Sequence, residues 1–104
     1  MIIKSPVDRW PGEVVLPDYL TLPQCAAWER AAQATRDCNT KAEIHQALFP
    51  AILAIVSEWR LENFPAQVTL ETFPGSPRKD STALIDAMVE AIARLYSGEE
   101  VPNV

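Results

Sequence analysis

The stretch TKAEIHQALFPAILAIVSEWRL, residues 40–61, decides which fold class the sequence predicts. Apolar residues recur through it at helical spacing, and Thr40 with Glu43 forms a capping box at its start. An apolar surface this wide is typical of a helix that is buried on more than one side. Pro50 lacks a backbone N–H and clashes with the preceding turn, so we expect a kink or a break near Phe49. The stretch therefore predicts one long, kinked helix.

Two further segments carry helical patterns. The first begins at a second capping box, Thr21 and Gln24, and continues through an alanine-rich run to about residue 36. The last runs from about Ser81 and has apolar residues on one face and a polar stripe on the other. Gly98 is placed as the residue that ends it. The sequence therefore predicts three main helices.

The remaining segments are predicted to be extended. Three prolines in residues 1–20 remove backbone donors and favour β or polyproline geometry, which fits either an arm over the body or a short hairpin. Residues 62–80 form an extended connector, and whether residues 67–73 of it pair with the N-terminal arm stays open. The predicted fold class is mainly α: a small bundle of three main helices, the second kinked at Pro50, followed by a flexible tail at residues 98–104.

The size and charge of the chain restrict its function. A chain of 104 residues is predicted to form one domain, residues 1–104. Fourteen acidic and nine basic side chains give a net charge of -5, whereas nucleic-acid-binding proteins usually carry a basic stripe. The most apolar run, residues 47–56, is much shorter than the roughly 20 residues that cross a membrane. We therefore predict a soluble, cytoplasmic protein that binds neither nucleic acid nor membrane.

The reactive side chains do not form a pattern typical of an enzyme. Cys25 and Cys38 are thirteen positions apart and His45 is the only histidine, which is too few ligands at the wrong spacing for zinc. His45 has no carboxylate and nucleophile beside it on its predicted helix face, so we expect a structural role for it. Whether the cysteines have a function stays open. We predict a non-enzymatic protein without a metal or cofactor.

Six large apolar side chains are candidates for a protein-binding surface: Trp10, Trp28, Trp59, Phe64, Phe73 and Met88. Trp10 and the two phenylalanines lie in proline-bordered, non-helical segments, where a large aromatic ring either folds back on the core or contacts a partner. The other three lie at helical spacing typical of a core, and they could instead line a groove for an amphipathic helix of a partner. Folding back is the more frequent outcome in so small a chain, and the sequence does not separate the two.

Four segments resemble small proteins of the tail modules of tailed phages and prophages: SPVDRWPGEVVLPDYLTLPQCAAWE (5–29), FPAILAIVSEWRLENFP (49–65), TFPGSPRKDSTALIDAMVEAI (72–92) and LYSGEEVPNV (95–104). In these segments the chain is similar to the tail assembly chaperones of long-tailed phages. The resemblance implies a small, largely α-helical protein that binds the long helical tape measure protein and helps to recruit tail tube subunits around it. It also implies that the protein is absent from the finished virion and that a ribosomal frameshift can produce a longer form.

Two other functions fit the same sequence. The chain could be a structural tail or head–tail joining subunit that stays in the particle, or a small acidic regulatory adaptor that binds a basic partner. Wide apolar helix faces also make it a candidate homo-oligomer.

Overall fold

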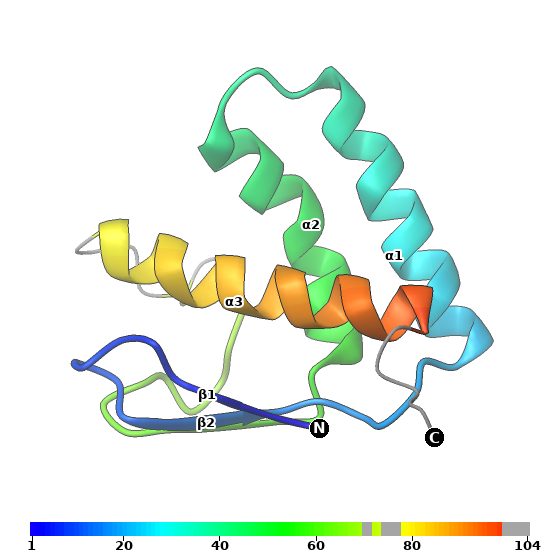
Figure 1. Cartoon of the computed structure of the whole chain (residues 1–104). Helices are drawn as coiled ribbons and strands as arrows, with labels where there is room; N and C mark the ends of the chain where they lie inside the picture. Colours follow the sequence, from blue (N-terminus) through cyan, green and yellow to red (C-terminus); the bar gives the residue numbers. More distant parts are fainter. Residues whose placement is uncertain (70–71, 74–77, 99–104) are drawn as a thin grey trace.

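The computed structural model describes residues 1–69, 72–73 and 78–98. In chain order the elements are β1 (Ile2–Lys4), β2 (Gly12–Val15), α1 (Leu22–Ala34), the 3-10 helix η1 (Thr35–Asp37), α2 (Lys41–Ile55), β3 (Glu58–Leu61) and α3 (Arg78–Ser97). The three strands form one antiparallel sheet, and the three helices lie over one face of it (Figure 1). The fold is therefore a layer of helices on a small sheet.

The predicted mainly α fold class is wrong, because part of the predicted second helix is a strand. Helix α2 ends at Ile55, where Val56 takes an extended conformation with φ -62° and ψ 126°. Residues Glu58–Leu61 then pair with Gly12–Val15 of the N-terminal hairpin. Their side chains alternate between exposed and half-buried, which is the two-residue period of a strand with one covered face. The fold is a mixture of helices and a sheet because the free edge of β2 is satisfied by this segment.

Helix α2 runs through Pro50 without a break. Pro50 cannot donate the hydrogen bond that the carbonyl of Gln46 would otherwise accept. Both residues are exposed, so water can bond to that carbonyl in place of the missing donor. The break that the sequence suggested near Phe49 does not occur.

The predicted starts of α1 and α2 and the predicted end of α3 are confirmed, whereas the second helix does not reach Leu61 as predicted. Thr21 and Gln24 bond reciprocally at the start of α1, and Thr40 and Glu43 do the same at the start of α2. Gly98 follows the last residue of α3 with φ 76°, a left-handed conformation that glycine adopts without steric cost. These signals were readable in the sequence because each depends only on residues within one turn.

The sheet has one apolar and one charged face. Its order is β1-β2-β3, and Ile3 lies beside Val14, which lies beside Trp59. Val14 is fully buried and the other two pack against the core, so this row faces the helices. On the opposite face the Arg60 guanidinium is 3.1 Å from a carboxylate oxygen of Glu13. The predicted N-terminal extension is thus a hairpin with a covered inner face.

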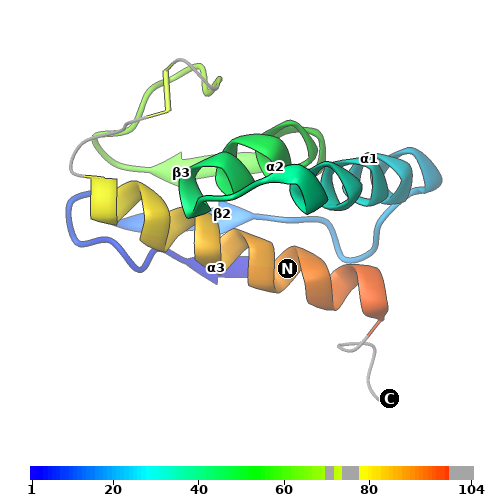
Figure 2. The ribbon, with the colours of Figure 1, turned by 90° about the horizontal axis from the view of Figure 1, so that it is seen from above.

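The core is built from side chains of the sheet, of the N-terminal turns and of all three helices. Figure 2 shows α1 and α2 side by side, with α3 crossing the sheet next to them. The buried apolar residues are Val7, Trp10, Val14, Leu16, Trp28, Ala31, Leu48, Phe49, Ala51, Ile52, Ile55, Leu84, Ile85, Met88 and Ile92. Across the described residues, no helix combines the length and the apolar character required to cross a membrane.

Candidate protein-binding surface

Helix α1 has an exposed stripe that begins with a large apolar residue. Leu22, Ala26, Glu29 and Gln33 follow one another at spacings of four, three and four, so they lie on one side of the helix. All four are exposed, and Leu22 is 85% exposed to solvent. Tyr19, in the turn before the helix, is 74% exposed. Large apolar surface is therefore concentrated where α1 begins.

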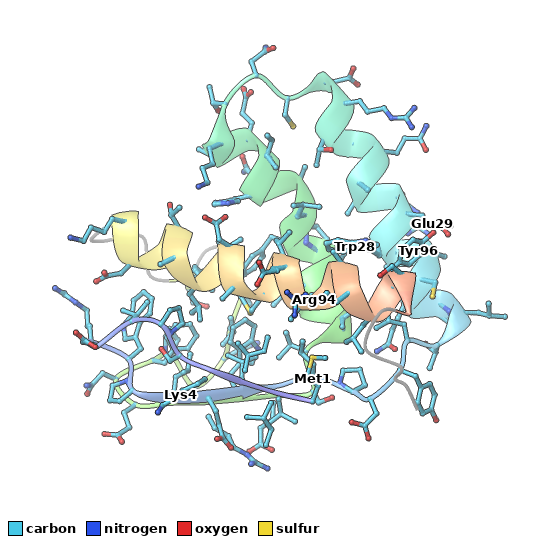
Figure 3. The ribbon with its side chains drawn as sticks, viewed as in Figure 1. Met1, Lys4, Trp28, Glu29, Arg94 and Tyr96 are labelled. Carbon is cyan, nitrogen blue, oxygen red and sulfur yellow. The ribbon has the colours of Figure 1, made fainter. Side chains whose placement is uncertain are left out.

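A groove lies next to this stripe, where the end of α3 meets α1. It encloses about 350 Å³ and is lined by Trp28, Glu29, Ala32, Gln33, Arg36 and Tyr96. Figure 3 shows Trp28, Glu29 and Tyr96 close together at this junction. The groove thus has an aromatic wall on each helix and charged groups at its rim. We call this groove, together with Tyr19 and Leu22, the α1 surface.

One hydrogen bond sets the shape of the groove. The Tyr96 hydroxyl donates to a carboxylate oxygen of Glu29, which joins the last turn of α3 to α1. This bond raises the pKa of Tyr96 above its ordinary value, and desolvation and the negative charge of Glu29 act in the same direction. The bond holds the Tyr96 ring at the side of the groove.

The start of α1 is held firmly although its side chains are exposed. The capping box of Thr21 and Gln24 satisfies free N–H groups of the first turn. The side-chain amide of Gln24 also donates to the carbonyl of Ala54 at 3.3 Å, which ties α1 to the end of α2. A partner that contacts Leu22 would therefore meet a preformed surface, with little ordering left to be done on binding.

The structure gives the six predicted binding residues different positions. Trp28 is 8% exposed, so it belongs to the core, and its remaining surface lines the groove. Trp10 and Met88 are 2% and 0% exposed, so both belong to the core and lie out of reach of a partner. The remaining three, Trp59 and the two phenylalanines, are half-buried and pack against the core.

Those three half-buried rings belong to an aromatic cluster of Trp10, Phe49, Trp59, Phe64 and Phe73. Trp59 stacks on Phe64 with centroids 5.6 Å apart, and Phe64 meets the edge of Trp10 at 5.2 Å. Phe73 meets Phe49 edge to face at 5.1 Å. Such pairs stabilise by about 0.5–1.5 kcal/mol beyond their buried area. The two phenylalanines of the connector thus fasten it to β3, to α2 and to the N-terminal turn.

The connector turns back on itself just before Phe73. The backbone N–H of Thr69 donates to the Thr72 hydroxyl at 2.8 Å, and the N–H of Phe73 donates to the Thr69 carbonyl at 2.8 Å. The described part of residues 67–73 is therefore a hydrogen-bonded turn, while residues 70–71 lie outside the described residues. In the sheet, strand β2 of the N-terminal hairpin pairs with β1 and with β3, and the described residues of 67–73 form no strand of it.

Tyr19, Leu22 and Tyr96 of the α1 surface were not among the predicted binding residues. A signal for Leu22 was present, because it lies six positions before Trp28 and so about 120° away from it around the helix. That offset places Leu22 outside the core stripe of α1. The groove had no such signal, since Tyr96 and Glu29 are separated by 67 positions and meet only through the packing of α3 on α1.

A polar cluster joins α2 to α3 away from the α1 surface. His45 is 2.9 Å from one carboxylate oxygen of Asp86, and the Lys41 ammonium is 2.9 Å from the other. Partial burial raises the pKa of Asp86, but the hydrogen bonds from Lys41 and His45 outweigh it and hold the pKa below its ordinary value. In the described ranges, no group of three His, Cys, Asp or Glu side chains is arranged to hold a metal ion.

Replacing Asp86 by asparagine is expected to change the pH dependence of stability. The pKa of Asp86 is lower in the folded protein than in the unfolded chain, where it is about 3.9. The carboxylate therefore stabilises the fold at pH values above the unfolded pKa, and this stabilisation is lost as the pH falls through the folded pKa. The wild-type Tm should therefore fall more steeply below about pH 5 than that of Asp86→Asn. The difference at pH 7 should be at most about 1 kcal/mol, because the carboxylate is half exposed. Thermal unfolding followed by circular dichroism measures both curves.

Glu90→Gln, on the exposed side of α3, serves as the control. Its Tm should keep the wild-type dependence on pH. Parallel curves for wild type and Asp86→Asn would show that the cluster does not stabilise the fold.

No protein-family model, curated protein or solved structure matches this chain at a significant level.

Proposed function

We propose that the protein is a non-enzymatic assembly chaperone of phage tails, which binds the tape measure protein in the host cytoplasm and holds it during tail morphogenesis. The resemblance of the sequence segments supports the class of protein. The observation that carries the proposal is the α1 surface, where Tyr19 and Leu22 are 74% and 85% exposed beside a preformed groove. Two large apolar side chains at one rigid helix start are suited to contact with another protein.

The partner proposed for this surface is an amphipathic helix, the element from which a tape measure protein is built. A helix can lie along α1 and place apolar side chains on Leu22 and in the groove beside Trp28, in the manner of helix-in-groove recognition. Glu29 and Arg36 at the groove supply one charge of each sign to polar residues at the edge of that helix. Covering apolar helix faces in this way would keep a long helical protein from aggregating.

Recruitment of tail tube subunits is the second step of the proposed function. It requires a second surface, because the tape measure helix occupies the α1 surface. The aromatic cluster beside the connector supplies half-buried rings on Trp59, Phe64 and Phe73. This cluster is the surface we assign to the recruitment of tail tube subunits.

Co-expression tests the proposal. Production of this chain together with the tape measure protein of the same tail module should raise the soluble fraction of the tape measure protein at least several-fold, and the two should co-purify. The reason is that the exposed apolar helix faces of the tape measure protein are covered. Soluble and pelleted fractions are compared with a co-expression of the tape measure protein and an unrelated small acidic protein.

Each other outcome points away from a chaperone. Unchanged solubility without co-purification would overturn the proposal. Detection of the chain in purified phage particles would identify a structural tail or head–tail joining subunit instead. Selective binding of a basic regulatory protein would identify an adaptor.

A further inference from the structure

Strand β1 forms one edge of the sheet, and the hydrogen bonds show which of its backbone groups face outward. Met1 and Leu16 exchange two bonds, from Met1 N to the Leu16 carbonyl at 2.9 Å and back at 2.8 Å. The Ser5 N–H also donates to a carbonyl of β2, at 3.0 Å. Bonded and non-bonded residues alternate in an antiparallel pair. The N–H and C=O groups of Ile2 and Lys4 therefore point to the free edge.

Among the described residues, none pairs with the outer edge of β1. Within the part of the chain that the structure describes, no hydrogen bond reaches the backbone of Ile2 or Lys4 from outside the β1–β2 pair. A groove of about 510 Å³ runs beside the edge and is lined by Met1, Ile2, Ile3, Lys4, Ala87, Glu90, Ala91 and Arg94. Figure 3 shows Arg94 on α3 above the strand that carries Met1 and Lys4. The two alanines of α3 leave room for a strand to lie along β1.

We infer that two copies of this chain join edge to edge through β1, in an antiparallel arrangement related by a two-fold axis at Ile3. Ile2 of one protomer then lies opposite Lys4 of its partner, and Lys4 lies opposite Ile2. Each of these pairs exchanges two backbone hydrogen bonds, because all the groups involved face outward. The two three-stranded sheets become one continuous sheet of six strands.

The side chains favour a second copy in this register. Shifting the partner by two residues in one direction places Lys4 opposite Lys4, which is destabilising. Shifting it in the other direction places Ile2 opposite Ile2, which removes the cover that Lys4 gives to Ile2. In the proposed register Ile3 meets Ile3 on the helix-covered face, and the aliphatic stem of Lys4 covers Ile2, which is 58% exposed in the single chain.

This dimer does not depend on the proposed function. It uses the edge of the sheet and the groove beside it, whereas the tape measure protein is assigned to the α1 surface, which shares no residue with either. It also differs from the self-association predicted from wide apolar helix faces. A failure of dimerisation would therefore leave the chaperone proposal standing, and the reverse is also true.

Sedimentation velocity over a range of protein concentrations tests the inference. The joined edges are short, so we expect a weak dimer whose fraction rises with concentration in the micromolar range. Lys4→Pro removes one outward N–H while the bonds to β2 remain, and it should abolish the concentration dependence. Lys4→Thr also replaces the lysine side chain but keeps the N–H, so its dimer fraction should still rise with concentration. A wild type that stays monomeric, or a Lys4→Pro variant that dimerises as strongly as wild type, would overturn the inference.

A cysteine cross-link tests the register even if Lys4→Pro fails to fold. With Cys25 and Cys38 replaced by serine, Ile3→Cys should form a disulfide-linked dimer on oxidation with oxidised glutathione. The two residues form a non-bonded antiparallel pair with Cα atoms about 4.5 Å apart, within the range a disulfide spans. Lys4→Cys in the same background should cross-link far less, because its neighbour is Ile2. Equal cross-linking of both variants would contradict the proposed register.

Discussion

Gly12→Ala is expected to lower the free energy of unfolding by about 3 kcal/mol or more, which is a large part of the stability of a domain of this size. Gly12 has φ 132°, a conformation that residues with a side chain rarely adopt. A Cβ atom at this position would lie 2.0 Å from the backbone carbonyl oxygen of Arg60 in β3. The backbone of Arg60 cannot move away as a flexible side chain would, so the clash is relieved only if β2 and β3 separate. The substitution therefore removes the strand pairing on which the mixed fold depends.

Urea denaturation followed by tryptophan fluorescence measures this loss, because Trp59 lies in β3. Gly98→Ala is the matched control. Gly98 also has a left-handed φ, 76°, but a Cβ atom there meets no other atom within 4 Å. Its cost should be only about 1 kcal/mol. Equal losses for the two variants would show that the contact between β2 and β3 is not as close as described.

Phe49→Ala is expected to cost about 3–5 kcal/mol, the range for removing a buried phenylalanine. Phe49 is 1% exposed and lies in α2. Its ring packs edge to face on Phe73, so its removal opens a cavity and also releases the end of the connector. The partly freed connector should then become sensitive to protease before the helices do.

Equilibrium urea unfolding and limited proteolysis check the two parts of this prediction. Pro50→Ala, at the next and exposed position, is the control and should leave stability unchanged or raise it. Alanine restores the N–H that the Gln46 carbonyl lacks within the helix. A loss below about 1 kcal/mol for Phe49→Ala would mean that the site collapses without a cavity.

The parts of the fold that local chemistry determines were predictable from the sequence. Capping at Thr21 and Thr40 and termination at Gly98 each involve residues within one turn, and all three are confirmed. Strand β3 was not predictable in this way. Trp59 continues the helical spacing of the preceding residues, and it also fits the alternation of Glu58–Leu61. Only the free edge of β2, more than forty positions earlier, decides between the two.

The candidate site was predictable only in part for the same reason. Trp28 could be placed on the core side of α1, because its residue type and its position on the helix are local properties. The opposite wall comes from Tyr96, which reaches Glu29 across 67 positions. His45 and Asp86 likewise meet across 41 positions, so the carboxylate partner of the histidine could not be read from its own helix. Exposure of Leu22 could be inferred from its position on α1, about 120° from Trp28, and not from its residue type.

Binding of tape measure helices at the α1 surface is tested most directly by co-expression with the double variant Tyr19→Ser/Leu22→Ser. Both side chains are more than two-thirds exposed, so the variant should fold as wild type does in circular dichroism. Ala34→Ser, on another side of α1, is the control and should keep the tape measure protein soluble. We predict that the double variant returns the soluble fraction of the tape measure protein to the level seen without a chaperone. A folded double variant that solubilises the tape measure protein as well as wild type does would contradict the proposed site.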